Sequence, residues 1–416
     1  MNQKVALMNL RKITPKLLCI FLSFLILNNS KAQNSIDDVG QINAINTAVP
    51  FLRIIPDARA GGMGDVGIAS SADAGGTYFN NSKLVFAPKK LGINLSYTPW
   101  LRNLGITDIY LAHFSGYYQL DKNQVISTSL KFFSLGNITF TDFQGNITGD
   151  FRPREMALDV GYARKLGKYY SLGIQLRYIY SNLASGQTVD GVPIKAGNAF
   201  GSDITMSYFK PIKLKKMNSQ LNVGLAITNL GSKISYSSDA LNQDYIPTNA
   251  GLGLGYQIFP KEKHEMSVYV DINKLLVPTP DTVDADGDGI FDYKQKSSIA
   301  GVFSSLGDAP GGFKEEMREF NYSIGVEYWY DKQFAVRAGY FLENKLKGNR
   351  KFFTAGLSAK YSVFGLDFSY LVPTSNQRSP LDNTFRFTLS FNFDKLGKKD
   401  KSPESGSEVM PTPVEE

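Results

Sequence analysis

The residues from Thr384 to Phe393 read Thr-Phe-Arg-Phe-Thr-Leu-Ser-Phe-Asn-Phe, and apolar and polar side chains alternate through the whole stretch. Successive side chains of a β-strand point to opposite faces of a sheet, so this period of two predicts a strand. Four earlier segments between Phe320 and Val372 repeat the pattern. Their polar faces, together with that of the last segment, carry the charges Glu327, Arg337, Lys360, Asp367 and Arg386.

Two architectures produce this alternation, and they place the two faces oppositely. A soluble β-sandwich buries the apolar faces between two sheets and leaves the polar faces in water. An outer-membrane β-barrel turns the apolar face toward lipid and keeps the charged face inside. The alternation alone does not distinguish them, so the lengths of the strands and of their connections have to decide.

The strand pattern extends over most of the chain. We expect about fourteen strands, most of them of ten residues or more, which suits tilted strands that cross a bilayer better than the five or six residues typical of soluble sheets. The expected strands lie near 90–98, 108–120, 124–140, 154–165, 169–183, 196–210, 218–235, 247–259, 264–276, 318–330, 333–343, 350–361, 363–373 and 384–393.

The connections between these strands alternate in length. The turns 121–123 and 331–332 are short, and the turns expected at 211–217 and 260–263 are somewhat longer and basic, whereas the opposite side includes the longest connection, 277–317. Short turns at one end and long loops at the other, over an even number of strands, are the signature of an outer-membrane barrel. The sequence therefore predicts an all-β fold, a 14-stranded antiparallel transmembrane β-barrel over residues 90–393, in the cell outer membrane with both termini in the periplasm.

The N-terminus has the pattern of a secretory signal. Basic residues precede an apolar run from Leu17 to Leu27, and a small residue, Ala32, ends the segment, so we expect a signal peptide over residues 1–32. Translation could instead start at Met8, which would give a signal of more usual length. The apolar run is too short to cross a bilayer as a helix, which predicts cleavage and export.

Composition limits what the exported chain can do. The only cysteine, Cys19, lies in the signal, so the mature fold has no disulfide. Five positive charges of the formal +7 also lie there, which leaves about +2 and gives no basic footprint for nucleic acid. At the other end, residues 394–416 are charged and proline-containing with few apolar residues, and we expect a disordered periplasmic tail.

Residues 33–89, between the signal and the first strand, lack a strand period and include a glycine-rich motif. No strand precedes this motif and no Gly-Lys-Ser/Thr follows it, as a phosphate-binding loop would require. Small residues at this density permit backbone to pack closely on backbone, so we expect an extended lead followed by a plug, or hatch, in the barrel lumen. The motif consists of Ala58, Arg59, Ala60, Gly61, Gly62, Met63 and Gly64.

The same motif, taken with the strand architecture, resembles the FadL-like superfamily of long-chain fatty-acid transporters, whose hatch carries Ala-Arg-Ala-x-Gly-Met-Gly. The Asn-Pro-Ala that usually follows is Asn81-Ser82-Lys83 here. Within the superfamily, the stretches 50–60 and 306–313 resemble the PorV/PorQ family, outer-membrane components of the Bacteroidetes type IX secretion system. This resemblance covers essentially the whole mature chain.

The PorV/PorQ resemblance implies a protein that is not an enzyme. It implies association with a SprA-type translocon, binding of the C-terminal signal domains of secreted cargo proteins, and delivery of cargo to an attachment complex. An alternative is a FadL-like transporter of hydrophobic small molecules, which needs an apolar pocket and an opening in the barrel wall. A hydrolase needs a nucleophile and a base, and His113 and His264 do not assemble into a Ser-His-acid constellation.

The longest connection carries a candidate metal site. Carboxylates at the first, third, fifth and ninth positions, with a glycine at the sixth, reproduce the start of an EF-hand calcium loop, but Gln295 stands where the usual bidentate glutamate would be. An acidic turn without an ion is the alternative. The predicted ligands of a structural calcium are Asp284, Asp286, Asp288, the carbonyl of Ile290, and Asp292.

Two further sets of residues follow from these assignments. Aromatic residues of the longest connection are the candidates for contacts with partner proteins, although they could instead pack within the loop. They are Phe291, Tyr293, Phe303 and Phe313. The mixed lumenal charges, Glu327, Arg337, Lys360, Asp367 and Arg386, do not form an ion-selective ring, so we expect them to pair with one another or with the plug.

Overall fold

The computed structural model describes residues 42–102, 105–142, 144–189, 192–214, 217–237, 243–374 and 383–394. The expected signal peptide and the expected tail beyond residue 394 lie outside these ranges. The chain divides into the units Met1–Ile42 and Asn43–Glu416, and everything that follows concerns the second unit.

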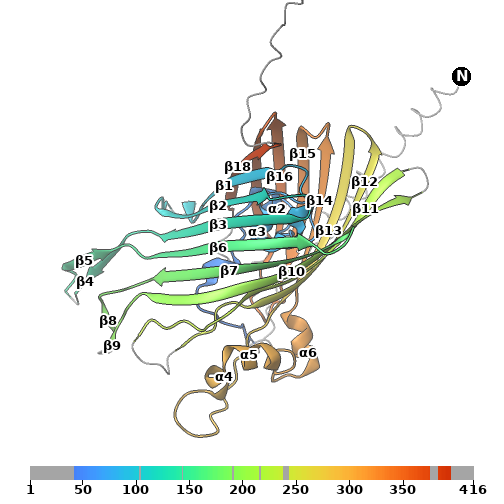
Figure 1. The fold of residues 1–416 in the computed structure, drawn as a ribbon. Coiled ribbons are helices and arrows are strands. Elements are labelled where there is room, and N and C mark those ends of the chain that lie inside the picture. Colours follow the sequence, from blue (N-terminus) through green and yellow to red (C-terminus); the bar gives the residue numbers. More distant parts are fainter. Residues whose placement is uncertain are drawn as a thin grey trace, which may run out of the picture. The chain divides into compact units, whose positions relative to one another are not determined.

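Fourteen long strands form one closed antiparallel barrel, in which the last strand pairs with the first (Figure 1). The fold class predicted from the sequence is confirmed. The barrel strands are β1 (Leu91–Pro99), β2 (Ile109–Gln119), β3 (Gln124–Leu135), β6 (Arg154–Lys165), β7 (Tyr170–Asn182), β10 (Gly197–Leu214), β11 (Met217–Gly231), β12 (Asn249–Lys261), β13 (His264–Leu275), β14 (Asn321–Tyr330), β15 (Phe334–Leu342), β16 (Lys351–Tyr361), β17 (Phe364–Pro373) and β18 (Phe385–Phe393).

The orientation of the two strand faces excludes the sandwich. On β6, Leu158 and Val160 are 46% and 62% exposed, whereas Asp159 between them is buried. The other barrel strands repeat this arrangement, with leucine, isoleucine and aromatic side chains outside and serine, threonine and charged side chains inside. An apolar exterior around a polar interior is the arrangement that a lipid environment requires.

Some connections differ from the expected ones. β3 ends at Leu135, well before residue 140, because Gly136 turns the chain with a positive φ of 84°. Beyond it, β4 (Ile138–Thr141) and β5 (Ile147–Phe151) form a separate hairpin, and β8 (Thr188–Val189) and β9 (Val192–Pro193) form another.

Two expected turns are shorter than predicted. β10 continues through the expected turn at 211–217 as far as Leu214 and pairs with Met217 of β11, and β12 continues to Lys261. Antiparallel strands can be joined by two residues, so the ladder extends as long as each residue finds a partner opposite. Because β10 and β12 extend into the expected turns, the difference in length between the short turns at one end of the barrel and the long loops at the other is larger than predicted.

The longest connection folds into short helices beyond the strand ends (Figure 1). They are α4 (Asp292–Gln295), α5 (Ser298–Ser304), α6 (Phe313–Glu316) and the 3₁₀ turn η5 (Met317–Glu319). Ser297 caps α5, because its side chain accepts a hydrogen bond from the backbone N–H of Ala300. No helix in the described ranges is long and apolar enough to cross a membrane.

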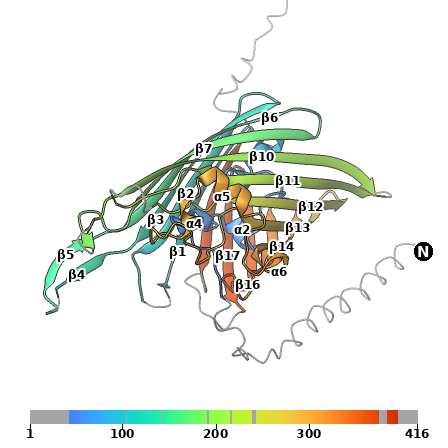
Figure 2. The ribbon, with the colours of Figure 1, turned by 90° about the horizontal axis from the view of Figure 1, so that it is seen from below.

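Residues 43–90 form what we call the interior segment, which contacts strands on different sides of the barrel. The short helix α2 (Ala58–Gly61) contacts β16, β17 and β18, whereas η3 (Asn81–Phe86) contacts β3, β6, β7 and β10. The remaining elements are η2 (Pro50–Arg53) and α3 (Gly76–Phe79). Figure 2 shows α2 surrounded by the strands.

Candidate functional site

Arg59 of the glycine-rich motif ties the interior segment to the barrel wall. Its guanidinium donates two hydrogen bonds to the carboxylate of Glu327 on β14, at 2.9 and 2.7 Å. It also donates to Asp73 at 2.5 Å and to the carbonyl and hydroxyl of Ser71. Burial raises the pKa of Asp73, but the charges of Arg59 and Lys83 outweigh burial and lower it below its ordinary value. The bidentate pair fixes both the distance and the orientation of α2 against β14.

Glu327 is shared with a second arginine, on the neighbouring strand. Arg337 of β15 lies directly opposite Glu327 and donates to it from Nε at 2.7 Å, and its Nη1 donates to Asp367 of β17 at 3.1 Å. The side chains of Glu327 and Arg337 are fully buried. Removing one partner of a buried ion pair leaves the other charge buried without compensation. The stability of each charged group in this network therefore depends on the others.

The two other predicted lumenal charges also have contacts within the chain. Arg386 of β18 is buried and donates to Asp65 of the interior segment at 3.1 Å. Lys360 of β16 lies over the ring of Trp329, with its Nζ 4.3 Å from the ring centroid. All five predicted lumenal charges thus contact other groups of the protein.

The glycines of the motif allow backbone to contact backbone. Gly64 adopts a positive φ of 68°, and a Cβ built on Gly339 of β15 would lie 2.1 Å from its backbone nitrogen and 2.1 Å from the carbonyl carbon of Met63. Gly62 faces Gly356 of β16 in a similar way, at 2.9 Å. Glycines of the motif therefore lie opposite glycines of the barrel wall. The sequence of the motif alone did not predict these wall glycines.

Lys131 of β3 holds the interior segment from a different part of the wall. Its ammonium group donates to the carbonyl oxygens of Phe51 and Leu52 at 3.2 Å each and to that of Ile54 at 2.8 Å. The same ammonium lies over the ring of Tyr78, 4.2 Å from its centroid. The charge of a wall lysine thus satisfies the carbonyl groups that end η2.

Buried charges also hold the end of the longest connection in place. Lys274 of β13 forms ion pairs with Glu316 at 2.7 Å and Glu319 at 2.5 Å. Lys347, in the next long connection, pairs with Glu315 at 2.6 Å and with Glu319 at 2.9 Å. Both lysines are buried. The segment that contains α6 and η5 is therefore fixed to the barrel rim.

Exposed apolar side chains gather along α5 and α6. Ile299 and Phe303 are 66% and 71% exposed, and their spacing of four residues places them on one face of α5. Leu306, in the turn that follows α5, is 60% exposed. Phe313 and Met317 are 80% and 43% exposed. We call these five residues the α5–α6 surface.

The opposite side of α5 packs against the protein. A Cβ on the buried Gly301 would lie 2.9 Å from the ring of Tyr245 and 3.2 Å from Pro278. The hydroxyl of Tyr245 donates to the carbonyl oxygens of Tyr293 and Lys296, at 2.9 and 2.7 Å. The helix is therefore supported from behind, so the exposed apolar row faces away from its support.

The four aromatic residues predicted as partner contacts occupy different environments. Phe303 and Phe313 belong to the α5–α6 surface. Phe291 is 41% exposed, and its ring stacks on that of the half-buried Tyr293 with centroids 6.2 Å apart, so this pair packs partly within the loop. Prediction from aromatic residues alone missed the apolar members Ile299, Leu306 and Met317.

The predicted calcium ligands are brought together only in part. Carboxylate oxygens of Asp284, Asp286 and Asp292 lie within 4.8 Å of one another. Asp288 is not part of this group, and its Oδ2 accepts a hydrogen bond from Gln295 Nε2 at 3.0 Å. The same amide donates to the carbonyl of Ile290 at 3.2 Å. Three converging carboxylates fit a hard cation, and calcium binding stays a prediction.

The family of the chain follows from a sequence comparison. A profile described as type IX secretion system protein PorV matches residues 37–282, more than half of the chain, and this range contains the glycine-rich motif and the strands from β1 to β13. The chain belongs to the PorV family. Membership in the PorV family makes it an outer-membrane component of the type IX secretion system, as the resemblance of its motifs implied. The match ends before the α5–α6 surface.

Solved structures similar to this chain include hydrocarbon channels and transporters. They include a TodX deltaS2S3 mutant monoaromatic hydrocarbon channel, with 13% identity and a TM-score of 0.47 over 81% of this chain and 98% of that one. They also include the Ralstonia pickettii toluene transporter TbuX (12%, 0.44, 80% and 97%) and a Pseudomonas aeruginosa FadL homologue (9%, 0.42, 84% and 99%). No curated protein matches the chain.

Proposed function

We propose that this chain acts in type IX secretion by binding other proteins, without catalysing a reaction. Its partners are a SprA-type translocon and the C-terminal signal domains of cargo proteins, which it hands to an attachment complex at the cell surface. The observation that carries the proposal is the α5–α6 surface. Large apolar groups exposed on a folded protein are costly in water, and several of them in one connection indicate a site where a partner completes the packing.

The support beneath this surface favours a binding role. Ion pairs of Lys274 and Lys347 hold α6 and η5, and Tyr245 holds α5 from the neighbouring long connection. A surface whose shape is fixed before binding loses less conformational entropy when the partner arrives. The connections 184–195 and 236–246 follow β7 and β11, at the same end of the barrel as the connection after β13, and their described residues extend the area proposed for cargo.

We also propose that the interior segment acts as a plug. Its contacts with Lys131, Glu327 and Arg386 attach it to widely separated strands, and a folded domain does not fit through a lumen that holds it. Cargo therefore crosses the membrane through the translocon, with this barrel at its side. Short turns then face the periplasm together with both termini, and the long connections face outward.

The double variant Phe303→Ser, Phe313→Ser tests the binding proposal. Loss of anchors worth about 2 kcal/mol each lowers affinity by roughly a thousandfold, so we expect loss of copurified translocon or cargo and a block of cargo release into the medium. The matched control is Ile147→Ser, since Ile147 is 72% exposed on a different outer hairpin. Normal secretion by the double variant, with the barrel present in the outer membrane, would favour transport of hydrophobic small molecules instead.

A further inference from the structure

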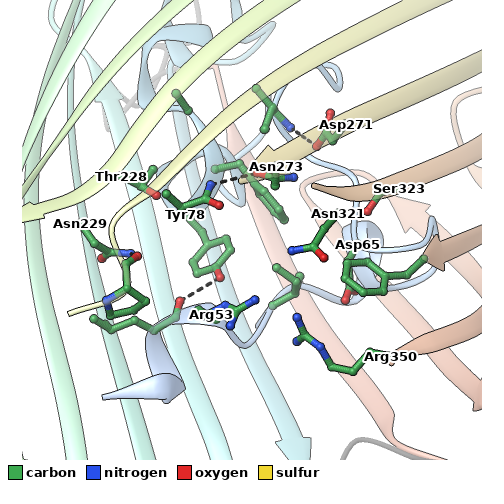
Figure 3. Close-up of a pocket in the computed structure, with 18 of the residues that line it drawn as sticks. Arg53, Asp65, Tyr78, Thr228, Asn229, Asp271, Asn273, Asn321, Ser323 and Arg350 are labelled. Atoms are coloured by element: carbon green, nitrogen blue, oxygen red, sulfur yellow. Dashed lines mark hydrogen bonds between the residues drawn. The ribbon is translucent and has the colours of Figure 1, made fainter. Parts of the chain in front are cut away.

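A polar cavity of about 120 Å³ lies between the interior segment and the barrel wall (Figure 3). Its wall is built from β11 to β15 near the ends that lead into the long connections. Asn249, Asn273, Asn321 and Ser323 face it from successive strands, and Tyr78 faces it from the interior segment. Amide and hydroxyl groups can donate hydrogen bonds to a polar ligand, and apolar side chains such as Ile55, Phe79 and Phe341 complete the lining.

Three arginines line this cavity, and one of them, Arg177, is paired with Asp159 and Asp203. The other two come from distant parts of the chain. Arg53 ends η2 of the interior segment, and Arg350 immediately precedes β16. Figure 3 shows both guanidinium groups turned toward the same space, beside the amide of Asn321. Their side chains retain 27% and 28% of their exposure, so neither is sealed in the packing.

The two guanidinium groups share a single carboxylate. Glu343 accepts two hydrogen bonds from Arg350, each at 2.8 Å. Its Oε1 is 3.8 Å from Nη2 of Arg53, which is too long for a hydrogen bond, and the guanidinium of Arg53 has no hydrogen-bond partner within the described part of the chain. A second acid of the cavity, Asp65, is paired with Arg386.

The electrostatics of the cavity agree with an uncompensated positive charge at this end. Burial and the charge of Arg350 lower the pKa of Arg53 to about 10, and the carboxylate of Glu343 offsets this only in part. The acid farther along the cavity, Asp271, accepts hydrogen bonds from the backbone N–H groups of Gly67 and Ile68 at 2.7 and 3.0 Å. Both bonds are accepted by Oδ2, which ties this acid to the interior segment.

We propose that this cavity binds one small oxyanion, a phosphate or a short carboxylate, between the guanidinium groups of Arg53 and Arg350. Guanidinium groups present parallel N–H donors that match the oxygens of such anions. About 10–15 Å³ of such space is enough to hold one water molecule, so a cavity of about 120 Å³ accommodates a small anion.

Binding at this position would connect two parts of the molecule. Arg53 belongs to the interior segment, and Arg350 belongs to the long connection that contains Lys347, one of the anchors of the α5–α6 surface. An anion between the two arginines would therefore stabilise the packing of the interior segment beneath the outer loops. The site is independent of protein binding by the α5–α6 surface, which can fail without affecting it.

Calorimetry on the purified full chain in detergent tests the proposal, with inorganic phosphate and citrate as probes and sodium chloride at equal ionic strength as reference. We expect saturable binding of at least one probe, and at least a tenfold weaker binding by Arg53→Gln. Arg53→Lys should retain part of the affinity, because it keeps the charge but loses the paired donors. The control is Arg152→Gln, an exposed arginine in the connection before β6.

Heat-modifiable migration on a denaturing gel checks that each variant is folded. Because the Arg53 guanidinium has no hydrogen-bond partner within the described residues, its replacement should leave the barrel intact. Absence of binding above the chloride reference for both probes would overturn the proposal. Equal affinity of the wild type and folded Arg53→Gln would overturn it as well.

Discussion

The interface between the interior segment and the barrel wall contrasts with the α5–α6 surface. At the first, Glu327 and Arg337 are completely buried, and the charges there are paired with one another. At the second, Phe303 and Phe313 are 71% and 80% exposed, and buried ion pairs hold the segment of α6 and η5. The usual distribution of apolar and charged groups is thus inverted in both places.

The two regions differ in whether their side chains have interaction partners within the same chain. Charges inside the barrel have partners from the same chain, so burying them yields a fixed arrangement in which each group specifies its neighbour. The apolar side chains of α5 and α6 have no comparable cover among the described residues. One region is a completed interface within a chain, and the other has the properties of half an interface between chains.

The change Glu327→Ala should break the first region most severely. It leaves the guanidinium groups of Arg59 and Arg337 buried without their shared carboxylate, and removal of one partner from a buried ion pair costs about 3–5 kcal/mol. We expect the free energy of unfolding to fall by that amount in urea titrations of the detergent-solubilised barrel. The exposed Glu262→Ala, in a short turn, is the control and should change it by less than about 0.5 kcal/mol. Equal midpoints for the two variants would show that the network does not stabilise the fold.

The change Gly339→Val should disturb the same region through shape alone. Its Cβ would overlap the backbone of Met63 and Gly64, so the interior segment must shift away from β15. Overpacking of this kind costs about 1–3 kcal/mol. If the segment is a plug, cells should also become more permeable to large antibiotics. Gly167→Val, in open space at a short turn, is the control, and unchanged stability and permeability for Gly339→Val would contradict the close packing.

Calcium should act on the second region and have the smallest effect. If Asp284, Asp286 and Asp292 bind one calcium at a dissociation constant near 1 mM, then 1 mM calcium stabilises the folded loop by about 0.4 kcal/mol. Calorimetry should show weak binding that Asp286→Ala abolishes. Asp150→Ala, which removes an exposed carboxylate from a different outer hairpin, should leave the heat unchanged. No heat of binding in the wild type at millimolar calcium would rule out the site.

The barrel could be predicted from the sequence because its determinants are local. A period of two fixes each strand, and the loop lengths fix the two ends, so the expected ranges and the observed strands agree closely. The errors occurred at 136–140 and 211–217, where a positive φ at Gly136 ended one strand and continued pairing extended another. Neither the turn at Gly136 nor the continued pairing of β10 can be predicted from the alternation of apolar and polar residues.

For contacts between distant parts of the chain, the sequence predicted that a charge would lie in the lumen, but it did not predict which residue would be its partner. The polar face of β14 placed Glu327 in the lumen, but its pairing with Arg59 depends on the non-periodic path of the interior segment. The shared carboxylate of Arg53 and Arg350 has no local signal at all. The pair Ile299 and Phe303 did have one, a helical spacing after the capping residue Ser297, which attention to aromatic residues alone overlooked.

The attachment of the interior segment has a consequence for the order of assembly. Residues 43–90 leave the ribosome before any strand, yet Arg59 needs Glu327 of β14, and Asp65 needs Arg386 of β18, the strand that closes the barrel. Loop closure over such separations is slow because its entropy is lost before the contact is gained. The interior segment precedes every barrel strand in the chain, and we expect its packing to be completed only when the final strand is in place.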